Sequence, residues 1–98
     1  MALKITNKQG VYELVGNLQG KNALSLQHHF EQLMTSTEKV ILSLDKVSSI
    51  DTYGIHVLNK LYRTAIKDNK IFYLIGSENN KIKTAFGNVS YMLRNDFL

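Results

Sequence analysis

The sequence contains no cysteine and no proline. Without cysteine there can be no disulfide, no cysteine-ligated zinc or iron–sulfur site and no thiol catalysis. No apolar run approaches the roughly 20 residues that a membrane span requires, and the first ten residues carry none long enough for a signal peptide. We therefore expect a cytoplasmic protein that does not enter a membrane.

The composition indicates one ordinary globular domain over residues 1–98. Hydrophobic residues make up 44% of the chain and charged residues 20%, and the net charge is +4. The basic residues are scattered, whereas nucleic-acid binders gather them in patches interleaved with aromatic residues. We expect no nucleic-acid partner, and we interpret Lys60, Arg63 and Lys67, which have helical spacing, as a solvated helix face.

Hydrophobic periodicity alternates between strand and helix. It predicts, in chain order, strands over 4–7 and 11–16 joined by a turn at Gly10, a helix over 23–34, a strand over 40–44, a helix over 54–68, a strand over 71–75, a third helix capped by Ser77 or Asn79, and an edge strand over 89–93.

The strands over 40–44 and 71–75 are separated by a helix, which makes them a parallel βαβ pair. The predicted fold is a single α/β domain with a mixed four- to five-stranded sheet and helices packed on it. The remaining tyrosines outside the loop described next are expected at the edge of the core: Tyr12, Tyr62, Tyr73 and Tyr91.

Residues 45–55, predicted as a loop, carry most of the functional information. Asp51 and Thr52 are good N-cap residues, Gly54 permits close backbone approach, and Ile50 and Ile55 have the spacing of a hydrophobic staple. One interpretation is a well-capped helix start. The other is a switch site, where a phosphate on a hydroxyl would be stabilised by the helix N–H groups.

The run over residues 40–55, which includes Ile50-Asp51-Thr52-Tyr53-Gly54, resembles the STAS domain of bacterial anti-sigma factor antagonists and sulfate transporter tails. In that family an apolar strand leads into an I-D-S-S-G-L loop, an amphipathic helix and a strand ending in V-G, as residues 71–76 do here. Residues 15–23 are similar to the family's G-x-L-D entry into its first helix. The resemblance covers nearly the whole chain.

The resemblance implies a STAS-like fold and a cytoplasmic protein-binding module without catalytic activity. Family antagonists bind an anti-sigma factor, often a serine kinase, and release a sigma factor; phosphorylation of the serine before the loop glycine reverses this. Tyr53 occupies that serine's position and Thr52 that of the preceding serine. Gln19 and Ser43 replace acids of the family pattern, whereas Asp51 and Gly54 are retained. Some members bind nucleotides.

Two hypotheses follow from this resemblance. The first is a phospho-regulated module for an anti-sigma factor or serine-kinase-like regulatory protein, with Thr52 as preferred phosphate acceptor and Ser49 and Tyr53 behind it. The second is a degenerate module that binds its partner constitutively as an adaptor or subunit. The expected partner-binding residues are Asp51, Thr52, Tyr53, Gly54 and His56.

An enzyme is the least favoured alternative. Asp51, His56 and Thr52 can be drawn as a catalytic set, but no second cluster supplies an oxyanion hole or a cofactor loop. His28 and His29 are adjacent on a helix and cannot share a metal. We expect no cofactor and no metal, and a weak homodimer could form through a sheet edge at 4–7 or 89–93.

Overall fold

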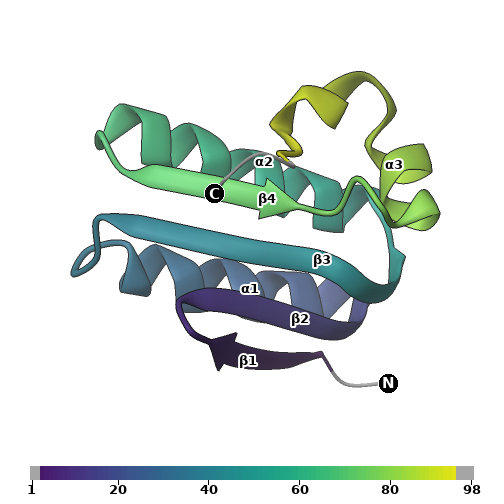
Figure 1. The fold of residues 1–98 in the computed structure, drawn as a ribbon, viewed down its shortest axis with the longest axis horizontal. Helices are drawn as coiled ribbons and strands as arrows, with labels where there is room; N and C mark the ends of the chain where they lie inside the picture. Colours follow the sequence, from purple (N-terminus) through teal and green to yellow (C-terminus); the bar gives the residue numbers. More distant parts are fainter. Residues whose placement is uncertain (1–2, 95–98) are drawn as a thin grey trace.

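A four-stranded mixed sheet organises the computed structural model, which describes residues 3–94 (Figure 1). Its strands are β1 (Lys4–Lys8), β2 (Val11–Leu18), β3 (Lys39–Ile50) and β4 (Ile71–Ile75), and they lie in the order β1-β2-β3-β4. β1 and β2 are antiparallel, whereas β2, β3 and β4 are mutually parallel. The predicted parallel pair is therefore confirmed, within a mixed sheet.

A two-residue turn joins β1 to β2. Gln9 and Gly10 both have positive φ, at 55° and 90°, and Lys8 pairs directly with Val11. Positive φ at both central residues is the requirement of the tight hairpin turns whose twist matches that of the strands. The predicted turn at Gly10 is confirmed.

Two long helices cover one face of the sheet (Figure 1). These are α1 (Gly20–Leu33) and α2 (Thr52–Lys67). The shorter α3 (Asn80–Phe86) and the 3₁₀ helix η1 (Gly87–Met92) lie beside the end of the sheet at which β4 terminates. The side chain of Asn79 caps α3 by accepting a hydrogen bond from the backbone N–H of Lys81 at 3.1 Å.

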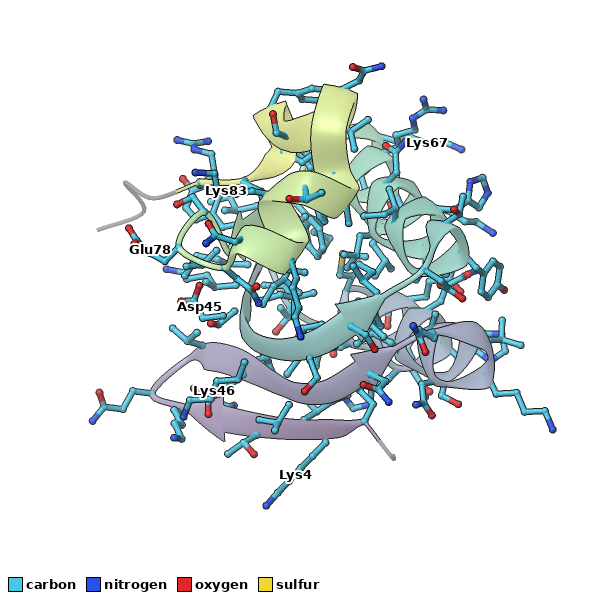
Figure 2. All side chains as sticks on the ribbon, turned by 90° about the vertical axis from the view of Figure 1, so that its right-hand side faces the viewer. Lys4, Asp45, Lys46, Lys67, Glu78 and Lys83 are labelled. Carbon is cyan, nitrogen blue, oxygen red and sulfur yellow. The ribbon has the colours of Figure 1, made fainter. Side chains whose placement is uncertain are left out.

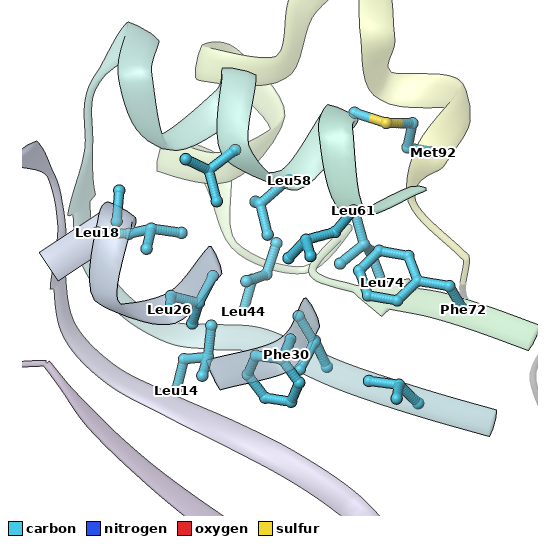
Figure 3. Close-up of a cluster of buried hydrophobic side chains, with 14 of the residues drawn as sticks. Leu14, Leu18, Leu26, Phe30, Leu44, Leu58, Leu61, Phe72, Leu74 and Met92 are labelled. Atoms are coloured by element: carbon cyan, nitrogen blue, oxygen red, sulfur yellow. The ribbon is translucent and has the colours of Figure 1, made fainter. Parts of the chain in front are cut away.

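The core fills the space between the sheet and the two long helices (Figure 3). Period-2 positions of β2, β3 and β4 meet the apolar faces of α1 and α2 there, which is the packing that both periodicities predict. The fully buried side chains include Leu14, Leu18, Leu26, Phe30, Leu42, Leu44, Leu58, Leu61 and Leu74.

Three details of the expected fold are wrong. β3 does not end at residue 44 but continues to Ile50, so much of the predicted loop is strand. Residues 89–93 form no edge strand: η1 occupies most of them, and only Leu93 makes a single bridge, to Leu74. Tyr91, expected at the edge of the core, is 62% exposed.

The apolar face of α2 is also rotated slightly from the expected one. The helical spacing of the apolar residues predicts a face made of Ile55, Leu58, Leu61, Tyr62, Ala65 and Ile66. Ile66 is 61% exposed, whereas Val57, which is outside this predicted face, is fully buried. The other expected positions of this face are buried or half-buried. Of the two edges considered for a homodimer, only the one that contains residues 4–7 belongs to an outer strand of the sheet.

Candidate functional site

The carboxylate of Asp51 holds the starts of both long helices. Its Oδ1 accepts a hydrogen bond from the backbone N–H of Gly54 at 2.7 Å, which caps α2 as the sequence predicts. Its Oδ2 accepts a second bond from the backbone N–H of Gly20 at 3.2 Å, in the first turn of α1. The N-termini of α1 and α2 are therefore tied to one side chain.

Gly54 allows the first turn of α2 to pack against the end of β2. A Cβ atom at this position would clash with the backbone carbonyl oxygen of Leu18 and would lie 2.8 Å from Cγ1 of Ile50. The same junction is closed by a backbone hydrogen bond from Asp51 N to Leu18 O at 3.4 Å. Only glycine fits here without displacing backbone, so the start of α2 has a fixed position.

Three predicted site residues face solvent from this fixed turn. Thr52 and His56 are exposed, and the Tyr53 side chain is 40% exposed. Thr52 is the first residue of α2, and its hydroxyl makes no hydrogen bond to any residue in the range 3–94. A hydroxyl and an aromatic ring thus stand next to each other, open to a visiting protein, at the N-terminus of a helix.

Ser49 lies in a different environment from the other candidate phosphate acceptors. It belongs to β3, where it pairs with Asn17 of β2, and its Oγ donates a hydrogen bond to Asn17 Oδ1 at 2.8 Å. The side chain is half-buried. A kinase would have to break this bond and reach into a strand, so Thr52 is the more accessible acceptor.

The structure does not assemble the Asp–His–hydroxyl set. Both carboxylate oxygens of Asp51 accept backbone N–H groups, and among the described residues no hydrogen bond joins Asp51 or Thr52 to His56. No group of three or more metal-ligating side chains occurs within residues 3–94. Over the same range, no helix has both the length and the apolar character needed to cross a bilayer.

Two features of the site were missed in the sequence. Gln19 is the N-cap of α1 but makes no side-chain cap, and Asp51, 31 residues away from Gly20, supplies the acceptor instead. Leu24 of α1 is 39% exposed, and it lies one turn after Gly20, at the same end of the helical layer as Tyr53. The available signal was that Leu24 falls outside the apolar stripe of its helix.

Comparison with known proteins assigns the family. The sequence model of the STAS domain matches residues 1–86, and the chain belongs to the STAS domain family. No curated protein matches its sequence.

Solved structures show the same fold. The chain is similar to the anti-sigma factor antagonist SpoIIAA in its unphosphorylated form, with a TM-score of 0.77 and 12% identity over 95% of this chain and 86% of that one. A putative anti-sigma factor antagonist of Thermotoga maritima gives a TM-score of 0.73 and 21% identity over 94% of this chain and 83% of that one. The structure of Mglu gives a TM-score of 0.65 and 19% identity over 78% of this chain. The match covers only 20% of the length of Mglu.

Proposed function

We propose that this STAS domain is a non-enzymatic regulatory module that binds an anti-sigma factor or a related serine-kinase-like protein through the first turn of α2. The observation that carries the proposal is the exposure of Thr52 and Tyr53 on a turn that Asp51 and Gly54 hold in place. A rigid turn loses little conformational entropy on binding, and exposed tyrosines are common anchors of protein interfaces. The similarity in fold to anti-sigma factor antagonists supports this class of partner.

We propose further that Thr52 is the phosphate acceptor of a switch. Its hydroxyl is exposed and unbonded at the N-terminus of α2, where helix N–H groups stabilise negative charge. A phosphate brings about −1.5 to −2 charges at pH 7. Buried under a partner it would cost about 3 kcal/mol, or roughly a hundredfold in affinity.

Mass spectrometry of the intact protein tests the switch. After incubation with ATP and the anti-sigma kinases of the source organism, we expect one added phosphate on the wild type and none on Thr52→Val, which keeps the shape of the side chain but lacks the hydroxyl. Ser49→Ala and Tyr53→Phe should be modified like the wild type. A Thr52→Val protein that still gains phosphate would rule out Thr52 as the acceptor.

The competing proposal is a constitutive adaptor without a switch. It is favoured by Tyr53, which stands where the family pattern has its phosphorylated serine. Such a module should bind its partner equally well with Thr52→Glu, whereas a switch at Thr52 predicts a large loss of affinity in that variant. Titration of an anti-sigma factor with the wild type and with Thr52→Glu distinguishes the constitutive adaptor from the switch.

A further inference from the structure

A line of basic side chains runs along the exposed side of α2. His56, Lys60, Arg63 and Lys67 follow one another at spacings of four, three and four residues, which places them on one face of the helix. All four are exposed. The line is about 17 Å long at 1.5 Å per residue. We call these four residues the α2 basic stripe.

Within residues 3–94, the cations of the stripe have no partner of opposite charge. Lys60, Arg63 and Lys67 form no ion pair and no hydrogen bond with any residue in the range 3–94. Helix α2 itself contains no acidic residue. Asp68 follows directly, but neighbouring positions on a helix point about 100° apart.

The described acids outside α2 form no ion pair with the stripe either. Glu31 of α1 accepts a hydrogen bond from Gln27 at 3.2 Å and makes no ion pair with α2 among the described residues. Asp45 and Glu78 lie on the opposite side of the molecule from Lys67 in Figure 2. No ion pair among the residues that the structure describes therefore neutralises the positive charge of Lys60, Arg63 and Lys67.

This arrangement does not benefit the helix as a whole. Lys67 lies in the last turn, where a cation is favoured by the helix dipole, but Lys60 and Arg63 lie in the interior. The pairs Lys60–Arg63 and Arg63–Lys67 place like charges three and four residues apart, which destabilises a helix. Stability therefore gives no reason to keep the stripe intact.

The stripe also borders a concave surface. A hollow of about 270 Å³ is lined by its four residues together with Asn59 and Thr64. Every charged group that lines the hollow is cationic. The hollow begins at His56, one helical turn after Thr52. The hollow is therefore continuous with the first turn of α2, which carries Thr52 and Tyr53 and which we call the docking turn.

We propose that the α2 basic stripe binds an acidic segment of the protein partner that docks at Thr52 and Tyr53. The inference rests on the proposed function and adds the chemistry of the partner's surface: carboxylates spaced to face Lys60, Arg63 and Lys67. It also gives a phosphate on Thr52 a second effect. His56 is four residues away, so the added negative charge would reduce the potential at the near end of the stripe and repel an acidic partner.

The test uses a helical alanine-rich peptide with glutamates at positions i, i+4, i+7 and i+11, and the same peptide with glutamines. NMR titration of the full chain should shift the amides of residues 56–67 with the glutamate peptide only. Lys60→Gln/Arg63→Gln/Lys67→Gln should weaken binding about tenfold at low ionic strength. The control Lys4→Gln/Lys39→Gln/Lys83→Gln removes three other exposed cations with the same change of net charge and should retain most of the affinity.

Equal losses in the two triple variants, or amide shifts outside α2, would overturn the inference. Tighter binding of duplex DNA or phosphatidylglycerol vesicles, lost in the stripe variant, would replace a protein partner by that ligand. The proposed function is judged separately: an anti-sigma factor that requires Tyr53 but tolerates loss of the stripe would refute only the acidic segment. An anti-sigma factor that requires the stripe but tolerates Tyr53→Ala would refute only the docking at Thr52 and Tyr53.

Discussion

One carboxylate fixes the geometry on which the docking turn depends. Asp51 accepts hydrogen bonds from the backbone N–H groups of Gly54 and Gly20. It therefore satisfies donors in the first turns of two helices that would otherwise have no partner. Its position beside both positive helix ends adds a favourable electrostatic interaction. Asp51 therefore holds the first turn of α2, with Thr52 and Tyr53, in place, and under the proposed function it would act on binding in this indirect way.

Replacing Asp51 by alanine should lower the free energy of unfolding by about 2 kcal/mol, because two N–H groups lose their acceptor. Asn keeps one side-chain oxygen and should lose about half as much. Urea denaturation measures both values. A loss below about 0.5 kcal/mol for Asp51→Ala, the range of ordinary surface substitutions, would show that the two bonds matter little.

Gly54→Ala should destabilise the fold by about 2 kcal/mol or more, because the added Cβ meets the backbone of Leu18 and the side chain of Ile50. Thr52→Ala, two residues away, is the control. Its side chain is exposed and unbonded, so the change should stay within about 0.5 kcal/mol. Thermal or urea unfolding measures the stability of both variants. Equal stabilities would contradict the close approach of Gly54 to Leu18 and Ile50.

The sequence reveals one of the two bonds of Asp51 and conceals the other. The cap on Gly54 is local, three residues along the chain, and an Asp before a helix start predicts it. The bond to Gly20 spans 31 residues and depends on how β2 and β3 pair, which no local pattern encodes. The 40% exposure of Tyr53 is compatible with its place among the expected partner-binding residues.

Strand β3 shows how a neighbouring element overrides local composition. Residues 45–49 include exposed Asp45, Lys46 and Ser48, which predict a loop. They remain strand because β2 runs alongside as far as the pairing of Leu18 with Ile50, with irregularities in the register that absorb the mismatch. The polar side chains simply face solvent, since only one face of the sheet is covered by the long helices.

In the segment after α3, a strand was predicted where the chain forms a 3₁₀ helix. Its apolar residues suggested a strand over 89–93, but apolar content alone does not distinguish a strand from a short helical turn. η1 buries Met92 while leaving Tyr91 outside. By contrast, β4 was predicted with its exact bounds because it is a continuous apolar run ended by Gly76.

An ion pair in the hairpin of β1 and β2 should make the stability of the fold depend slightly on pH. A hydrogen bond from Lys8 and the charge of Lys46 lower the pKa of the Glu13 carboxyl below its ordinary value of 4.5. A lowered pKa in the folded state adds stability that is present above the ordinary value and is lost as pH falls through the folded value.

Glu13→Gln should therefore be less stable than the wild type at neutral pH, and the difference should disappear as Glu13 becomes protonated in acid. Urea midpoints of both proteins, measured from pH 7 down to about pH 3, test this. The same deficit at both ends of the range would mean that packing, and not the charge of Glu13, accounts for it.

Across the whole molecule, both long helices begin at the same end of the sheet, next to the end of β3. In sheets with parallel strands, this is the end at which binding sites are commonly placed. The docking turn lies there, and the α2 basic stripe extends from it along the helix. In the proposed function, the STAS fold supplies the rigid position of this turn, and the surface chemistry of α2 selects the protein that binds there.

The most direct test of the docking turn is calorimetric titration of an anti-sigma factor from the source organism with the wild type, Tyr53→Ala and Tyr91→Ala. Tyr91 is an exposed aromatic control on η1, in ring contact with Tyr62, which lies about 14 Å along α2 from Tyr53. We predict that Tyr53→Ala weakens binding at least about tenfold, as truncation of an aromatic anchor does, and that Tyr91→Ala binds like the wild type. Wild-type affinity in Tyr53→Ala would contradict docking at the start of α2.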